Sequence, residues 1–370
     1  MIKEVKLQEI LDIRDGTHDS PKYVNNGYPL VTSKNIKDGT IDFSNVNLIS
    51  KEDFDKINKR SEVQNGDIIM PMIGTIGNPV IVNTDKRFAI KNVALFKFES
   101  NELLNNDYLF YYLKSKNFYH QINLIKRGGT QSFISLSDIR NLMIPMFTVS
   151  RQREIVNILK KAESLINKRK GQILELSFLT KSIFLEMFGD PISNSKGINT
   201  KKGSELFNFS SGKFLNNNDR TSEQGYPVYG GNGINGLSQS FLIDYSTIVI
   251  GRVGAYCGSI HRSEPLSWVT DNAIYIKNNK MNQNIYFLYH LFQNLNLNRF
   301  ADYSGQPKIT QKPLLEIDYI YPPMSLQNQF EDKLRTIEIL KEKLEISLEL
   351  FENNFNSLMQ RAFKGDLFND

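Results

Sequence analysis

The chain contains 370 residues, of which 40% are hydrophobic and 23% charged, and its formal net charge is +5. This composition is typical of a folded, soluble protein, and the length suits two domains better than one. The single cysteine, Cys257, excludes a disulfide framework and a four-thiolate zinc site, and it fits a reducing, cytoplasmic location. Charge alternates over residues 1–6 and no stretch approaches the roughly 20 apolar residues that cross a bilayer, so we expect neither a signal peptide nor a membrane segment.

Residues 1–147 form a first mixed region that is rich in turn residues. The apolar runs at 67–70 and 94–98 are bounded by Gly, Asn and Pro, which predicts short strands. Residues 108–117 predict a short helix, and their aromatic side chains are expected to lie in the core.

Residues 148–190 predict the first of two long helices. Pro145 precedes this segment and Gly189 follows it, as expected at helix ends. Apolar residues repeat at alternating four- and three-residue spacing, which is typical of a coiled-coil seam. The seam positions are Ile155, Leu159, Ala162, Ile166, Ile173, Leu176, Ile183 and Met187.

Residues 191–323 form a second mixed region, and residues 324–370 a second long helix. Strands are expected at 247–250 and 273–276, and a short helix at 285–294. Pro322 precedes the long helix, and Gly365 lies near its C-terminal end. The second seam contains Phe330, Leu334, Ile337, Leu344, Leu348, Phe351, Phe355, Leu358 and Ala362.

The second half of the chain repeats the first. Seven short matches keep their order, among them 27–29 with 225–227, 73–77 with 250–254, 129–131 with 304–306, and 145 with 322. In this register Gln152 corresponds to Gln329, and Thr75-Ile76 to Arg252-Val253. So long a period indicates two domain-sized copies and not a solenoid.

We therefore expect an α+β protein: two mixed α/β domains, at 1–147 and 191–323, separated by two long helices at 148–190 and 324–370. Charged residues flank each narrow apolar stripe, which favours a two-helix seam over a buried bundle. Antiparallel pairing uses the chain most economically and gives a pseudo-twofold internal repeat.

This order of domain, helix, domain and helix resembles the specificity subunits of type I restriction-modification systems. The stretches that carry the resemblance are 7–10 with 15–21, 129–131, 145–155 and 250–254. It implies that each mixed domain is a target-recognition domain for half of a split, asymmetric site in double-stranded DNA. It also implies that the helices are the spacer between the halves.

The resemblance further implies partner subunits. Two methyltransferase subunits would dock on the helices and bind S-adenosylmethionine, and restriction or translocase subunits would bind ATP and Mg²⁺. No cofactor is expected in this chain itself, and no membrane partner.

Candidate DNA contacts lie on loops, because reading residues usually sit on loops of a rigid scaffold. Arg and Lys can pair with guanine or phosphate, and Asn and Gln with adenine. Solvated loops and tight turns are the alternative interpretation. The candidates are His18, Lys34, Asn35, Arg127, Gly129, Thr130, Gln131, Ser132, Lys213, Tyr229, Asn232, Arg252, Arg262, Gln306 and Lys308.

A search for catalytic motifs finds no catalytic or metal-binding residues. Tyr321-Pro322-Pro323-Met324 lacks the polar residue that an amino-methyltransferase places before Pro-Pro, and no phosphate-binding loop for ATP exists. Two alternatives to a DNA reader stay open: a coiled-coil adaptor that binds only proteins, and a DNA-modifying enzyme with an unrecognised motif.

Overall fold

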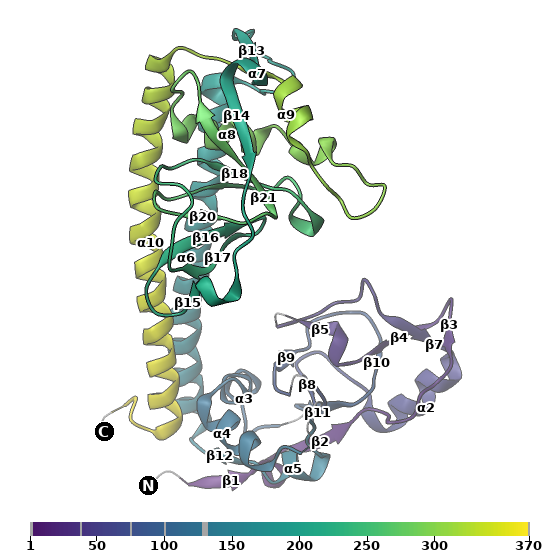
Figure 1. Ribbon diagram of the computed structural model, residues 1–370. Helices are drawn as coiled ribbons and strands as arrows, with labels where there is room; N and C mark the ends of the chain where they lie inside the picture. The colour runs from purple at the N-terminus through teal and green to yellow at the C-terminus, as the bar shows by residue number, and fades with distance from the viewer. Residues whose placement is uncertain (1–2, 38, 75, 100, 128–131, 369–370) are drawn as a thin grey trace. The chain divides into compact units, whose positions relative to one another are not determined.

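The computed structural model describes residues 3–37, 39–74, 76–99, 101–127 and 132–368 (Figure 1). The chain divides into two compact units. Unit 1 comprises Met1–Arg169 and Ser347–Asp370, and unit 2 comprises Lys170–Ile346. Two long helices, α6 (Val149–Phe188) and α10 (Met324–Lys364), each contribute one part to unit 1 and the other part to unit 2.

The mixed part of unit 1 contains short strands and helices. They are β1 (Glu4–Lys6), α1 (Leu7–Ile10), β2 (Asp12–Asp15), β3 (Tyr23–Val24), β4 (Tyr28–Val31), η1 (Ser33–Asn35), β5 (Ile36–Lys37), β6 (Thr40–Ile41), β7 (Asn47–Ile49), α2 (Lys51–Ser61), β8 (Ile68–Pro71), β9 (Val80–Ile81), β10 (Ala89–Ile90), β11 (Val93–Lys97), α3 (Asn106–Leu113), α4 (Lys116–Ile125), α5 (Leu136–Arg140) and β12 (Met143–Pro145).

The mixed part of unit 2 follows the same plan. Its elements are β13 (Thr200–Lys202), α7 (Gly203–Leu206), β14 (Phe207–Ser211), η2 (Asn217–Asp219), β15 (Arg220–Thr221), β16 (Tyr226–Gly230), β17 (Gly233–Ser238), β18 (Ile248–Gly251), η3 (Gly254–Tyr256), β19 (Ile260–Arg262), β20 (Trp268–Val269), β21 (Ala273–Asn279), α8 (Ile285–Asn294), η4 (Leu297–Phe300), α9 (Gln311–Glu316) and β22 (Asp318–Ile320).

Matching sheets confirm the internal repeat. Unit 1 has four-stranded sheets in the orders β2-β11-β8-β9 and β10-β4-β7-β3, and β1 pairs with β12. Unit 2 has the equivalent orders β14-β21-β18-β19 and β15-β17-β16-β20, and β13 pairs with β22. Every residue of β8, β11 and β18 is buried, which explains why these strands read as continuous apolar runs in the sequence.

Equivalent backbone hydrogen bonds correct the register of the repeat. The N–H of Gly74 donates to the carbonyl of Ser132 (2.9 Å), and the N–H of Gly254 donates to that of Pro307 (2.9 Å). Gly74 and Gly254 both have positive φ, which glycine adopts without strain. Gly74 therefore corresponds to Gly254 and not to Gly251, so the sequence match of Thr75-Ile76 with Arg252-Val253 was wrong.

A buried glutamine anchors each mixed region to its long helix. Oε1 of Gln152 accepts the N–H of Asn105 (2.8 Å), and its Nε2 donates to the carbonyls of Leu103 (3.0 Å) and Phe147 (2.9 Å). Both nitrogen and oxygen of the amide are thus satisfied inside the core, where an unpaired polar group would be costly.

Gln327 plays the same part on α10. Its Oε1 accepts the N–H of Asn284 and its Nε2 donates to the carbonyl of Pro322, both at 2.9 Å. Gln327 is 1% exposed, whereas Gln329 is exposed. The predicted counterpart of Gln152 was therefore wrong by two positions, because Pro322 occupies the place of Phe147 and not that of Pro145.

The core of unit 1 packs α3 against parts of both long helices. The tyrosines of α3 are buried, which confirms their prediction as core residues. The hydroxyl of Tyr108 donates to the carbonyl of Pro145 (2.7 Å), and that of Tyr111 donates to Glu163 on α6 (2.7 Å). The ring of Phe363, near the end of α10, lies 5.4 Å from that of Tyr108.

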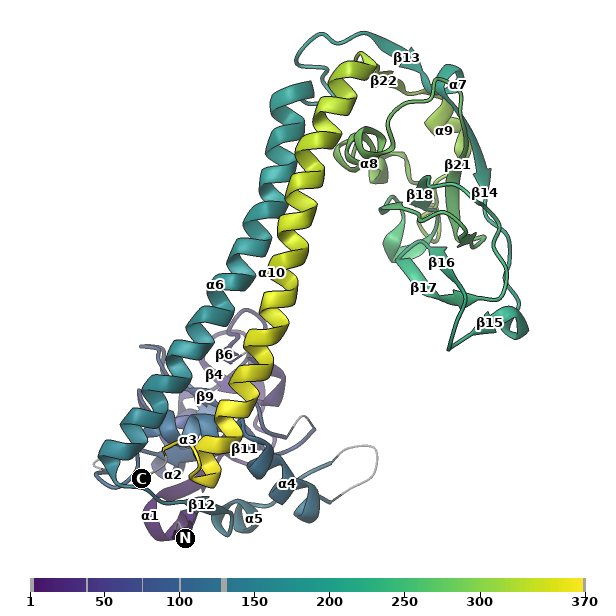
Figure 2. The same ribbon diagram turned by 90° about the vertical axis from the view of Figure 1, so that its left-hand side faces the viewer.

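The core of unit 2 packs α8 against the end of α6 and the start of α10. The ring centroid of Phe188 on α6 lies 4.9 Å from that of Phe287 on α8 and 5.3 Å from that of Phe330 on α10. Within each unit the beginning of one long helix thus packs beside the end of the other. In each unit the segments of α6 and α10 therefore run antiparallel and side by side (Figures 1 and 2).

Burial along the long helices follows the predicted stripe. The most buried positions are those that also contact a mixed region. The middle of each stripe is half-buried, because there only the other long helix covers it. Ile155, Leu159, Ile166, Leu334 and Ala362 are buried, whereas Ile173, Leu176, Ile183, Ile337, Leu344, Leu348, Phe351, Phe355 and Leu358 are half-buried. The stripe misses Phe184 and Phe188, which are fully buried because α8 covers their side of α6.

Two helix boundaries differ from the sequence prediction: the second long helix, expected at 324–370, ends at Lys364, and one short helix is divided. Gly189 and Gly365 have positive φ directly after the long helices, as expected for C-terminal caps. The helix expected at 108–117 is two helices, because α3 ends at Leu113 and the hydroxyl of Ser115 accepts the N–H of Phe118 to begin α4.

Replacing the buried amide of unit 2 should destabilise that unit. Gln327→Ala leaves the N–H of Asn284 without its partner, and we expect the free energy of unfolding of unit 2 to fall by about 1–3 kcal/mol. Trp268 is the only tryptophan and lies in unit 2, so its fluorescence during urea unfolding reports this unit. Gln329→Ala is the matched control and should leave the midpoint unchanged; equal effects of both changes would contradict the anchor.

The stability of unit 2 should also depend on His290. Burial, and secondly the charge of Arg262, lower the pKa of His290 from 6.5 to about 4. Between pH 6.5 and 4 the unfolded chain binds this proton and the folded chain does not, so stability falls as pH falls, by up to about 3 kcal/mol. In His290→Leu, Trp268 fluorescence should show a smaller stability loss over this range; an unchanged pH slope would refute the assignment.

Candidate nucleic-acid interface

Five segments of unit 2, one of them the loop 270–272 between β20 and β21, surround a groove of about 730 Å³. Another is the hairpin at 302–308. Two hydrogen bonds between the backbones of Asp302 and Lys308 join its ends (2.9 and 3.1 Å). The others are η3, the turn between β16 and β17, and the segment after β14. The lining residues are Phe214, Leu215, Asn217, Arg220, Gly230, Gly231, Asn232, Asn235, Val253, Gly254, Ala255, Tyr256, Thr270, Asp271, Asn272 and Gln306.

Two of the sequence candidates, Asn232 and Gln306, lie together in this groove. Both are exposed, as are Lys213 and Lys308 on the neighbouring loop segments. Arg252 is half-buried, and its Nη1 donates to the carbonyl of Asp271 (3.5 Å) at the groove's edge. Sequence reasoning thus placed five candidates on the loops that form or border the groove.

Unit 1 has the equivalent backbone hydrogen bonds between described residues. Paired hydrogen bonds join the backbones of Arg127 and Phe133 (3.0 and 2.9 Å), and Ser132 accepts from Gly74. The exposed guanidinium of Arg127 lies 3.5 Å from the carboxylate of Asp138. The candidates Gly129, Thr130 and Gln131 lie outside the described residues.

His18 belongs to a polar network in unit 1. Its Nε2 lies 2.9 Å from the buried carboxylate of Asp15, and its Nδ1 lies 2.8 Å from Oδ1 of Asn92. Arg60 also forms an ion pair with Asp15. The imidazole is exposed yet held in place, so it can present an edge to a ligand without first losing side-chain entropy.

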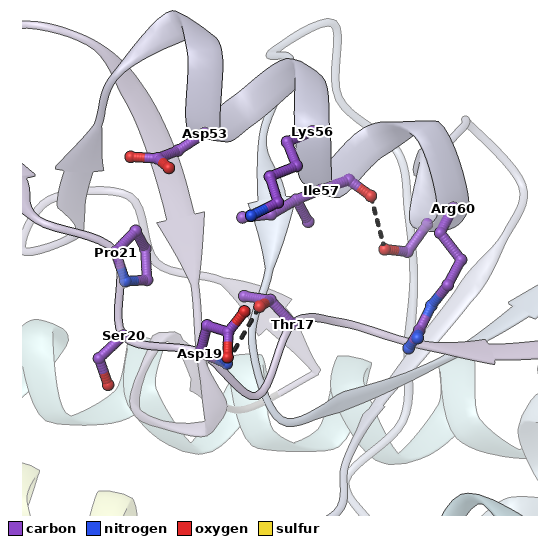
Figure 3. Close-up of a pocket in the computed structure, with 9 residues that line it drawn as sticks. Thr17, Asp19, Ser20, Pro21, Asp53, Lys56, Ile57 and Arg60 are labelled. Atoms are coloured by element: carbon purple, nitrogen blue, oxygen red, sulfur yellow. Dashed lines mark hydrogen bonds between the residues drawn. The ribbon is translucent and has the colours of Figure 1, made fainter.

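A pocket of about 210 Å³ adjoins this network (Figure 3). Lys56 points from α2 toward the loop that carries Asp19, Ser20 and Pro21, and Asp53 lines the same space. A phosphate here would meet two carboxylates as well as the cations. The mixed charge therefore gives the pocket no clear preference for an anion.

Three candidates have structural roles. Asn35 is buried, and its Oδ1 accepts the N–H and the hydroxyl of Thr32, both at 3.0 Å. Tyr229 is 4% exposed, its hydroxyl accepts the N–H of Glu264 (3.2 Å), and burial raises its pKa. Neither side chain is presented to a ligand, whereas Lys34 beside Asn35 is exposed.

Arg262 is the third, because it joins the mixed region of unit 2 to α10. Its guanidinium lies 3.4 Å from Glu338 and stacks on the ring of Tyr286 at 4.1 Å. The sequence suggested a DNA contact because arginine can pair with guanine or phosphate. The fold instead directs this side chain toward the long helix.

Sequence reasoning missed Phe214 and Tyr256, although both line the groove with exposed aromatic rings. Phe214 occupies the position of His18, because Gly16 and Gly212 donate equivalent backbone hydrogen bonds to Val93 and Ala273 (3.0 Å each). No sequence signal equates an imidazole with a phenyl ring, so only the structure reveals this correspondence.

The long helices of unit 2 carry a second exposed surface. Leu174, Phe178 and Leu185 are all exposed on α6, and their spacing of four and seven residues places them on one face, away from the seam. Ile339 and Ile346 are exposed on α10 at a spacing of seven. Large exposed apolar groups in such rows are typical of protein interaction sites.

Within the described ranges, no three His, Cys, Asp or Glu side chains gather as metal ligands would. No helix in the same ranges is both long and apolar enough to cross a membrane.

Comparisons with known proteins agree on one family. The family described as the type I restriction modification DNA specificity domain matches residues 2–176 and 195–350. The specificity subunit of the type I restriction enzyme EcoprrI of Escherichia coli is 32% identical over 102 residues, which are 28% of this chain and 25% of that protein. The chain spans less than half of the length of the curated relatives it matches.

Two solved structures share the fold. The S subunit of a type I restriction-modification system from M. genitalium has 20% identity and a TM-score of 0.54, covering 98% of this chain and 96% of that one. A chain from a study of the assembly and conformational transition of the type I R-M system has 16% identity and a TM-score of 0.64, covering 99% and 98%. Because the family match extends over both repeats, the chain belongs to the family of type I restriction modification DNA specificity domains.

Proposed function

We propose that this chain is the DNA-reading specificity subunit of a type I restriction-modification complex and acts without catalytic chemistry of its own, in the cytoplasm. Each mixed region, expected at 1–147 and 191–323, is a target-recognition domain that reads one block of a split site. The long helices, expected at 148–190 and 324–370, set the gap between the blocks. The closest support is family membership, since the matched relative carries the name of specificity subunit.

The observation that carries the proposal is one loop skeleton present twice with different side chains. Paired backbone hydrogen bonds join Arg127 to Phe133 in unit 1 and Asp302 to Lys308 in unit 2. On a neighbouring loop, His18 of unit 1 occupies the position that Phe214 has in unit 2. The two equivalent positions therefore carry a polar ring in unit 1 and an apolar ring in unit 2. The two blocks should therefore differ in sequence, and the whole site should be asymmetric.

Affinity should come from backbone contacts and specificity from the loops. Exposed cations such as Lys34, Arg127, Lys213 and Lys308 suit phosphate oxygens, which position a protein without reading sequence. Ser132 and the amides at Asn232 and Gln306 suit base edges. Binding should weaken as salt rises, because phosphate contacts release counterions.

The exposed apolar rows on α6 and α10 support docking of partner subunits. We propose that methyltransferase subunits, two in the full complex, cover these rows, and that restriction subunits join the assembly. S-adenosylmethionine, ATP and Mg²⁺ would then be bound by the partners, and their chemistry would be directed to the site that this chain reads.

Selection from a pool of randomised duplex DNA tests the reading function. The full chain at about 50 mM salt should enrich two short blocks of different sequence, separated by an unread gap. Enrichment of one contiguous block, or of a perfect palindrome, would contradict the proposal. Failure to enrich any sequence would favour a protein-binding adaptor instead.

A charged substitution in the exposed row tests the docking surface. Phe178 is 62% exposed, so Phe178→Asp should leave the fold intact but place a charge in the partner interface. Co-purification of the methyltransferase subunit should drop at least tenfold. Met281→Asp, which alters an exposed apolar residue on a loop of unit 2, is the control. Undiminished co-purification with Phe178→Asp would remove this surface from the interface.

A further inference from the structure

We propose that the groove of unit 2 reads adenine–thymine base pairs, with amide side chains contacting adenine and aromatic rings contacting thymine. This inference rests on the proposed function and adds the kind of base that one domain selects. It is carried by the types of side chain in the groove, by their hydrogen bonding, and by the glycines that line it.

Four amide side chains line the groove: Asn232, Asn235, Asn272 and Gln306. All four residues are exposed, and among the described residues only the backbone carbonyl of Asn235, not its amide, accepts a side-chain hydrogen bond. Each amide offers one donor group and one acceptor, which is the complement of the N7 acceptor and N6 donor of adenine in the major groove. The groove thus presents several copies of the adenine-reading group.

Each of the two guanidinium groups near the groove uses one nitrogen in a hydrogen bond to the groove's own wall. Nη1 of Arg220 donates to the backbone carbonyl of Asn235 (2.7 Å), and Nη1 of Arg252 to that of Asp271 (3.5 Å). Bidentate reading of guanine needs an arginine fork with both nitrogens available. The amides are therefore better placed than the arginines to select a base.

Three glycines line the groove, and one of them lies beside the amide of Gln306. Gly230, Gly231 and Gly254 carry no side chain into the groove, which lets a base edge approach the backbone. A Cβ atom at Gly254 would lie 3.0 Å from Nε2 of Gln306. A side chain at this position would crowd the amide, so glycine at 254 leaves Gln306 room in the groove.

The aromatic residues of the groove can contact the second base of the pair, thymine. Phe214 is 69% exposed and Tyr256 is 49% exposed, and both line the groove. Thymine, the partner of adenine, presents its C5-methyl group in the major groove, where apolar side chains recognise it. Amide and aromatic groups in one groove can therefore contact both bases of an A·T pair, which neither group does alone.

The test compares variants of Gln306 by selection from the same randomised duplex pool. In Gln306→Ala, discrimination at one adenine position of one block should fall about tenfold, while the other block is unchanged. In Gln306→Glu the amide donor is lost and an acceptor pair remains, so the preference at that position should move from adenine to cytosine. Asn208→Ala, an exposed amide on β14 outside the groove, is the control and should keep the full motif.

The outcomes separate this inference from the proposed function. If the wild-type chain enriches two blocks but both Gln306 variants keep the same motif, the groove does not read bases. A change confined to a G·C position would overturn the preference for adenine. A uniform loss of affinity without a change of motif would make Gln306 a backbone contact. If the wild-type chain enriches no motif, the proposed function fails and this inference fails with it.

Discussion

The buried glutamine at the start of each long helix is the contact on which the rest of the structure depends. Gln152 and Gln327 each bind a backbone N–H just before a domain helix and a backbone carbonyl just before the long helix. A buried amide is tolerated only when its donor and acceptor are both satisfied, so these bonds admit one arrangement of the three segments. Each mixed region is thereby held in a fixed orientation on its own helix.

This anchoring separates the parts that must stay constant from the parts that can vary. Each core uses the start of one long helix and the end of the other, so Phe363 completes unit 1 and Phe188 completes unit 2. In unit 2, the hairpin and turns that carry the candidate reading residues lie outside this core. Their side chains can differ between the repeats without a loss of packing, as the exchange of His18 for Phe214 illustrates.

The sequence predicted the elements well and the correspondence between the repeats poorly. Long helices, buried strands and core tyrosines follow from periodicity, which is a local property. The spacing between equivalent residues changes along the chain, so sequence matching paired Gln152 with Gln329 and Gly74 with Gly251. Candidate contacts failed where tertiary structure decides the role: Asn35 and Tyr229 are held in the interior, and Arg262 turns to Glu338. The groove residues Asn272 and Phe214 come together only in three dimensions.

The most direct measurement concerns the gap between the two DNA blocks. If each domain is fixed to its helix and the helices set the spacing, one heptad added to both should lengthen the gap. The insertions belong directly after Arg169 and directly before Phe351, whose side chains contact each other, so that the seven-residue period of the seam is kept. Seven residues add about 10 Å of helix, or roughly three base pairs of DNA. Selection with this variant should return the same two blocks with a gap longer by about that amount, at reduced affinity, because three base pairs also rotate the second block about the DNA axis by roughly a third of a turn. An unchanged gap at full affinity would contradict the account.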